Sequence, residues 1–210
     1  MADIFDEINE ELKQDRMAAL WQRYGKYLIA VVVAIVAGVS LSQGYSYYSA
    51  QRDGRSADAF FQAILSDDIS AGLSAAAPEL NDGYGLLAEF RSAAALAEAG
   101  QASEAEQAYL AVAERTDGEQ IYRDIALLLS VMHAPATADA DDLQARLAPL
   151  TASSSSLQGL ALEQAAALDL RRGDKAAAID KLNRLVALTE IPSSLRQRAA
   201  QILSVIAEDN

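Results

Sequence analysis

The chain has 210 residues, a formal net charge of −13 at pH 7, no cysteine and one histidine, His133. The lack of cysteine excludes disulfides and thiolate metal sites, and a single histidine excludes zinc sites built on a histidine pair. A chain this acidic repels phosphate backbones, which argues against general nucleic-acid binding. Hydrophobic residues make up 51 % of the sequence, a fraction that is typical of a folded protein and too high for a disordered one.

An uncharged, largely apolar run occupies residues 27–51. As a helix these 25 residues would be about 38 Å long, which exceeds the roughly 30 Å hydrocarbon core of a bilayer. Aromatic side chains, which favour the two lipid–water interfaces, flank the apolar centre of the run, residues 28–41. The predicted interface anchors are Trp21, Tyr24, Tyr27, Tyr45, Tyr47 and Tyr48. The sequence therefore predicts a single transmembrane helix over residues 27–51.

Two other interpretations of this run stay open. A buried core helix or strand of a soluble domain is equally apolar, and a cleaved signal peptide also has an apolar centre. Against the signal peptide, the preceding 26 residues hold six acids and four bases, unlike a short basic leader.

Basic residues near the run predict its orientation. The bases before it are Lys13, Arg16, Arg23 and Lys26, and those that follow closely are Arg52 and Arg55. Because basic residues concentrate on the cytoplasmic side of a membrane, we expect the N-terminus in the cytoplasm. Residues 52–210 are then expected on the far side, which in the inner membrane of a bacterium is the periplasm.

The leader, residues 1–26, has a stripe of apolar residues among acids. Ile4, Phe5, Ile8 and Leu12 recur at helical spacing. This pattern predicts a short amphipathic helix that lies on the membrane or docks on a partner, although its acids disfavour anionic lipid. A solvated leader whose apolar face is incidental is the alternative.

Beyond the run, apolar residues recur with helical spacing and no strand is indicated. Ser103 and Glu106 have the spacing of a capping box, which predicts a helix start at Ser103. All four prolines are expected near segment ends, where they interrupt no hydrogen-bond ladder. The fold class is therefore all-α. The predicted helices cover residues 53–66, 69–77, 84–99, 103–116, 119–132, 139–148, 157–172, 174–188 and 192–208.

Two of the predicted helix pairs share one pattern around a turn at Gly100 or Gly173. A small residue lies seven positions before each glycine, and alanine, a large residue and an apolar residue lie five, nine and twelve positions after it. Ala138 as a third turn centre keeps the later apolar positions, but its small position holds Val131. The turn centres are 38 and 35 residues apart, close to the roughly 34-residue period of a tetratricopeptide repeat. An irregular bundle with accidental periodicity is the alternative.

The order of these parts carries a resemblance to a known family. An acidic leader, the stretch Trp21-Gln-Arg-Tyr-Gly-Lys26, the apolar run and degenerate repeats follow one another. This order resembles the bacterial family of single-pass inner-membrane proteins with a periplasmic tetratricopeptide-like domain, which includes the ancillary subunit of the SecYEG translocon. The resemblance implies association with translocon subunits and with a membrane-anchored, isomerase-like periplasmic chaperone. The expected regions are a cytoplasmic leader (1–26), a transmembrane helix (27–51) and a periplasmic helical domain (52–210).

No arrangement in the sequence predicts catalysis, a cofactor or a metal. Paired acids such as Asp67-Asp68 and Asp141-Asp142 fall at expected helix starts, where they complement the helix dipole. His133 ends a predicted helix, where a capping role is the simple interpretation and a pH-sensing or ligand role is the sharper one. We therefore expect no enzyme.

Helix-pair solenoids bind partners on the concave surface formed by the first helix of each pair. An acidic groove there favours basic or apolar segments. The sequence thus predicts a periplasmic scaffold for the translocon and chaperones; the alternative is a self-associating structural factor of envelope or division assemblies, and both allow a homo-oligomer. Core packing or simple solvation would also explain each residue expected on this surface. These residues are Phe90, Ala94, Glu98, Tyr122, Glu163 and Arg171.

Overall fold

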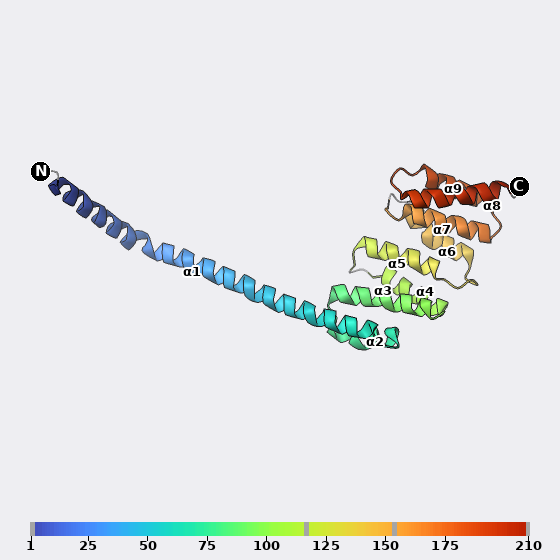
Figure 1. The fold of residues 1–210 in the computed structure, drawn as a ribbon, viewed down its shortest axis with the longest axis horizontal. Coiled ribbons are helices and arrows are strands. Elements are labelled where there is room, and N and C mark those ends of the chain that lie inside the picture. Colours follow the sequence, from blue (N-terminus) through green and yellow to red (C-terminus); the bar gives the residue numbers. More distant parts are fainter. Residues whose placement is uncertain (1–2, 116–117, 153–154, 209–210) are drawn as a thin grey trace. The chain divides into compact units, whose positions relative to one another are not determined.

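A computed structural model describes residues 3–115, 118–152 and 155–208, with side chains described for Val31 and from Ile35 to Ala207 within these ranges (Figure 1). Over these residues the elements are helical and none is a strand, so the all-α prediction is confirmed for this part of the chain. The chain divides into two units, residues 1–55 and residues 56–210, each with its own set of contacts.

In the first unit, the described residues belong to a single long helix, α1 (Asp3–Ile64), which ends in the second unit. Within residues 31–55, the large apolar side chains that are described are exposed, as at Ile35, Val39 and Leu41.

The predicted transmembrane segment lies only partly within the described residues. The side chains of residues 27–30 and 32–34 lie outside them, as do those of the leader and of the expected anchors Trp21, Tyr24 and Tyr27. Among the helices and side chains that are described, none offers an apolar stretch of membrane-spanning length. The remaining expected anchors, Tyr45, Tyr47 and Tyr48, are all exposed.

The second unit is a stack of helix pairs (Figure 1). Each helix from α2 onward contacts the next one along the chain, and α7 also contacts α5 and α9, which is the predicted solenoid arrangement. The stack opens with the end of α1, α2 (Ile69–Ala76) and the 3₁₀ helix η1 (Ala77–Glu79), and it closes with α9 (Ser193–Glu208). The three pairs between them are α3 (Asp82–Glu98) with α4 (Ala102–Ala113), α5 (Gln120–Met132) with α6 (Ala140–Ala152), and α7 (Gln158–Arg171) with α8 (Lys175–Ala187).

The repeat positions counted from the turn centres form the core of this stack. The small position seven residues before the turn is buried in each pair, and even Val131 is only 7 % exposed. Because positions of equal register are buried in all three pairs, the spacing reflects packing, and the alternative of accidental periodicity is wrong. The buried residues five, nine and twelve positions after the turns are Ala105, Tyr109 and Val112, then Leu143, Leu147 and Leu150, then Ala178, Leu182 and Leu185.

Gly100 and Gly173 end the first helices α3 and α7 with a left-handed backbone, at φ angles of +77° and +80°. Each closes a Schellman motif, in which the N–H of the next residue donates to a carbonyl five residues back. The N–H of Gln101 lies 2.9 Å from the Leu96 oxygen, and the N–H of Asp174 lies 2.9 Å from the Asp169 oxygen. Only glycine adopts this φ without strain, so both turns depend on it.

Gly100→Ala is expected to lower the free energy of unfolding by about 1 kcal/mol. An added Cβ would meet nothing within 4 Å, so backbone strain is the whole cause. The matched control is Gly85→Ala inside α3, where an added Cβ also meets nothing within 4 Å. There, helix propensity predicts stabilisation by about 0.5–1 kcal/mol. Urea unfolding curves measure both variants, and a shift of both in the same direction would contradict this explanation.

Acids lie at two helix starts, as the sequence predicts. Asp68 caps α2 by accepting from the N–H of Ala71 at 2.9 Å, and Asp141 and Asp142 lie in the first turn of α6.

Ser56 links the end of α1 to the start of α3. Its hydroxyl donates to the Glu79 carbonyl at 2.9 Å and accepts from the N–H of Asn81 at 3.0 Å.

Three local predictions are wrong. The helix expected over 53–66 has no start of its own, because Gly54 does not interrupt α1. The capping box at Ser103 is absent: α4 begins at Ala102, and Glu106 forms an ion pair with Arg146 of α6 instead. Pro149 lies inside α6, in its last turns, where the exposed position of Ala145 lets water replace the lost backbone donor.

Candidate interaction surface

The first helix of each pair leaves large apolar side chains uncovered. The second helices α4, α6 and α8, all of whose residues are described, expose no large apolar side chain. The asymmetry between the two helices of a pair therefore gives the stack one apolar side. The exposed side chains on α3, α5 and α7 are Leu87, Ile121, Tyr122, Met132 and Leu160, with exposed fractions between 37 % and 54 %.

The densest part of this side lies on α5. Tyr122, Ile125, Leu129 and Met132 follow one another at intervals of three or four residues, which places them on one face of the helix. Tyr122 and Met132 are exposed and the other two are half-buried, whereas Val131, on the other side of the helix, is only 7 % exposed. This face of α5 carries no charged side chain.

The same register extends the stripe to the neighbouring pairs. Leu87, Ile125 and Leu160 each lie thirteen positions before their turn centre. In a stack of equivalent repeats, such positions lie on the same side of the stack. We call the α5 stripe together with Leu87 and Leu160 the first-helix surface.

Only some of the residues that the sequence predicts for this surface lie on it in the structure. Tyr122 belongs to it, and Glu98 and Arg171 are exposed near the ends of α3 and α7. Glu98 pairs with Arg91 at 3.2 Å, and Arg171 donates to the Ala138 carbonyl at 2.8 Å.

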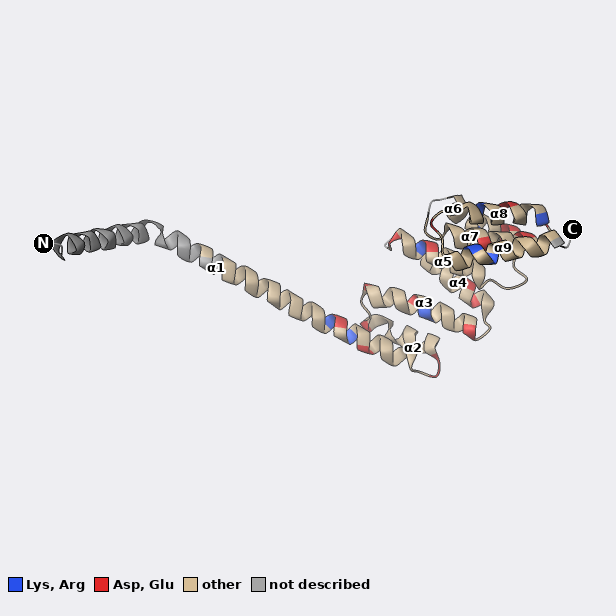
Figure 2. Cartoon of the chain, turned by 45° about the horizontal axis from the view of Figure 1, so that its top comes forward, with Lys and Arg blue, Asp and Glu red and all other residues tan. Residues whose placement is uncertain are grey.

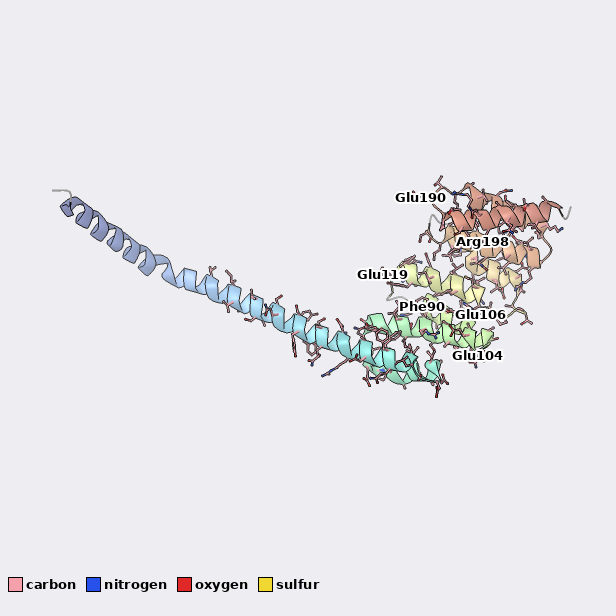
Figure 3. All side chains as sticks on the ribbon, viewed as in Figure 1. Phe90, Glu104, Glu106, Glu119, Glu190 and Arg198 are labelled. Atoms are coloured by element: carbon pink, nitrogen blue, oxygen red, sulfur yellow. The ribbon has the colours of Figure 1, made fainter. Side chains whose placement is uncertain are left out.

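Of the three other predicted residues, Ala94 on α3 is half-buried, and Phe90 and Glu163 contact neighbouring helices. Phe90 on α3 is half-buried, and its ring centroid lies 6.3 Å from that of Tyr109 (Figure 3). The side chain of Glu163 is only 12 % exposed and accepts two hydrogen bonds from Arg198 of α9, at 2.9 and 2.8 Å. These two residues hold neighbouring helices together. Leu87, Met132 and Leu160 of this surface were not predicted, although the register counted back from the turns is shared by Leu87 and Leu160.

A buried carboxylate joins α6, α7 and α8. Asp169 is fully buried, and its Oδ1 accepts from Gln144 Nε2 at 2.8 Å and from Arg172 Nη2 at 2.6 Å. Lys181 of α8 donates to the other oxygen, Oδ2. Arg172 also pairs with Asp141 of α6. Because two bases and an amide surround the buried charge, the cluster acts as a polar cross-link between repeats.

The only histidine of the chain ends α5. The N–H of His133 donates to the Leu129 carbonyl at 3.0 Å, as expected for a helix-ending residue. Its ring stacks on the buried ring of Tyr109, with centroids 5.5 Å apart and planes 22° from parallel. The contact joins α4 to the end of α5, which gives His133 a packing role.

Tyr109 makes the stability of this packing sensitive to alkali. Burial raises the pKa of Tyr109 above its ordinary value of 10.0, Glu98 raises it further, and Arg91 opposes the shift. The raised pKa means that the folded state favours the protonated phenol. The contribution of this phenol to the free energy of unfolding is therefore complete below pH 10 and is lost as the pH rises through the raised pKa.

As the pH rises above about 10, Tyr109→Phe is therefore expected to lose less free energy of unfolding than the unmodified chain. The phenylalanine ring keeps most of the buried contacts but has no proton to lose. Tyr122→Phe, on an exposed ring, serves as the control and should follow the unmodified chain. Equal slopes for all three proteins in urea unfolding at each pH would exclude a contribution from Tyr109.

The sequence profile of the tetratricopeptide repeat-like domain family matches residues 18–140, which is more than half of the chain. The chain belongs to this family. The match begins within α1 and ends at the first residue of α6, and the pair α7–α8 continues the same register beyond it. Neither the curated proteins nor the solved structures contain a match to the chain.

Tetratricopeptide repeat-like domains serve as protein–protein interaction scaffolds, and their members are typically non-catalytic adaptors. Family membership therefore identifies protein partners as the class of ligand for this repeat stack. Among the side chains that are described, no group of three or more histidine, aspartate or glutamate residues could hold a metal ion. The expected contacts with the translocon and a chaperone stay predictions.

Proposed function

We propose that this protein is a membrane-anchored scaffold whose first-helix surface binds protein partners in the periplasm. The proposed partners are subunits of the Sec translocon and a membrane-anchored periplasmic chaperone. The observation that carries the proposal is the confinement of exposed large apolar side chains in the three helix pairs to α3, α5 and α7. Contiguous exposed apolar patches mark interaction sites, and tyrosine and methionine are enriched at the centres of such interfaces.

The anchor is proposed on the composition of residues 27–51. They carry no charge, bases concentrate before them, and the tyrosines that follow the apolar centre are exposed. Membranes washed in alkaline carbonate should retain the full chain. A protein released by the wash, or a C-terminal tag reachable only from the cytosol, would contradict the anchored topology.

Photo-crosslinking in intact membranes tests the binding surface. A benzoylphenylalanine placed at Tyr122 is expected to crosslink translocon subunits or a membrane-anchored chaperone. The same group at Asn183, exposed on the second helix α8, is the matched control and should give no such product. A third position, Leu41, reports contacts along the proposed anchor.

The products distinguish the proposal from its runner-up. Heterologous products at Tyr122 that disappear on adding Met132→Gln support a scaffold whose apolar stripe binds partners. Crosslinks between copies of this chain alone favour a self-associating structural factor instead. Equal heterologous products at Tyr122 and Asn183 would contradict the assignment of the binding surface.

A further inference from the structure

A cleft of about 760 Å³ lies between α2, η1, α3 and α4, away from the first-helix surface. Its floor is apolar and buried, because Leu73, Ala88 and Val112 are at most 7 % exposed. At its rim, Arg115 Nη1 lies 2.8 Å from each carboxylate oxygen of Glu89. The volume falls within the range of natural ligand pockets.

The cleft exists because this helix pair lacks the large side chains that fill the equivalent space in the later pairs. Eleven positions before the turn, α7 has the buried Leu162, whereas α3 has the exposed Glu89. Eight positions after the turn, α6 and α8 have Arg146 and Lys181, which form ion pairs between helices. The equivalent residue of α4 is Ala108, which lines the cleft. The opening is therefore specific to the first pair.

The part of the stack that holds the cleft is strongly acidic. Residues 56–115 contain ten acids and two bases, one of which, Arg115, lines the cleft, whereas residues 163–208 contain six acids and seven bases. In Figure 2 the bases of this unit gather on α7, α8 and α9. Acids that line or border the cleft include Asp82 and Glu89 in its wall and Glu79 in η1. The resulting negative potential attracts cations and repels acidic segments.

We propose that this cleft binds a lysine- or arginine-rich amphipathic segment of a partner polypeptide, as a second site separate from the first-helix surface. The apolar floor receives the hydrophobic side chains of the segment and the stems of its basic residues. Asp82 in the wall and Glu79 in η1 accept hydrogen bonds from its cationic heads, whereas Glu89 is paired with Arg115. Small residues such as Gly85, Ala108 and Ala111 let the backbone of the segment approach α3 and α4 closely.

Peptide binding to the full chain, kept in a mild zwitterionic detergent, tests the site directly. The probe is a fluorescent helical peptide of about fourteen residues, with leucines on one face and lysines on the other. The matched probe carries glutamate in place of every lysine. The lysine peptide is expected to bind at least about tenfold more tightly, with an affinity that falls as salt rises from about 0.05 M to about 0.5 M. Equal binding of the two peptides would overturn the proposal.

Filling the cleft identifies the site. Ala108→Arg introduces a long basic side chain, as α6 and α8 have at the equivalent position. It is expected to lower the affinity for the lysine peptide by at least about tenfold. Ala111→Arg, at an exposed position of the same wall, is the second variant in case the first one does not fold. Tyr122→Ser, on the first-helix surface, should leave peptide binding unchanged. Unaltered binding in a folded filled variant would overturn the proposal.

Because the chain has no cysteine, single thiols can map the contact. The lysine peptide should protect Ser74→Cys, in the cleft, from maleimide and leave Ser204→Cys, exposed on α9, reactive. Protection of Ser74→Cys by higher chain concentration alone would identify a second copy as the occupant and contradict a basic partner. The outcome is independent of the proposed function, since the crosslinks at Tyr122 report the other surface.

Discussion

Asp169→Ala is expected to lower the free energy of unfolding by about 3–5 kcal/mol. The substitution removes the shared acceptor of Gln144, Arg172 and Lys181, so that α6 and α8 lose their polar link through α7. For a unit of this size the melting temperature should fall by roughly 6–20 °C. Differential scanning calorimetry and urea unfolding measure the change.

Two further substitutions show whether the buried charge is the cause. Asp180→Ala, exposed on α8, should change stability by less than about 0.5 kcal/mol. Asp169→Asn keeps the size and one acceptor oxygen but removes the charge. Its loss of free energy of unfolding should therefore lie between those of Asp169→Ala and Asp180→Ala. If Asp169→Ala costs no more than Asp180→Ala, the cluster does not hold the repeats together.

Leu162→Ala is expected to cost about 2–5 kcal/mol, whereas Leu160→Ala should cost less than about 1 kcal/mol. The two leucines lie two residues apart on α7, yet Leu162 is 1 % exposed and Leu160 is 37 % exposed. The first truncation leaves a cavity in the core, and the second removes a side chain that water already reaches. Urea unfolding of the two variants gives the comparison.

When partner binding is measured, Leu160→Ala should have the larger effect of the two substitutions. Leu160→Ala removes part of the first-helix surface, so it is expected to reduce the crosslinks formed from Tyr122 while the protein stays folded. A destabilisation by Leu160→Ala as large as that by Leu162→Ala would show that the register of α7 is wrong. Unchanged crosslinking in Leu160→Ala would remove that leucine from the surface.

The repeat core was predictable from the sequence because its positions recur. Each pair must bury side chains at the same distances from its turn, so the residues around Gly100 and Gly173 carry the pattern twice. Val131 breaks the preference for a small side chain, yet it is buried like its counterparts. Stacking buries side chains at regular intervals along the chain, and such intervals can be seen in a single sequence.

Contacts between repeats were not predictable in this way. Asp169 resembles many other acids in an acidic chain, and only the packing of three helices shows that it is buried. Glu106 matched a capping box by spacing, but in the fold it pairs with Arg146, forty positions away. Glu163 was expected on a binding surface and instead pairs with Arg198 of α9. Each of these partners is set by the angle between helices, which short-range patterns do not encode.

The measurement that tests the central claim most directly is thiol protection of the first-helix surface in its native membrane. In this cysteine-free chain, Tyr122→Cys and Asn183→Cys each provide one reactive site. The account predicts that Tyr122→Cys reacts slowly with maleimide in intact membranes and rapidly after purification, while Asn183→Cys reacts equally in both. If Tyr122→Cys reacts at the same rate in both settings, no partner covers the first-helix surface and the account is contradicted.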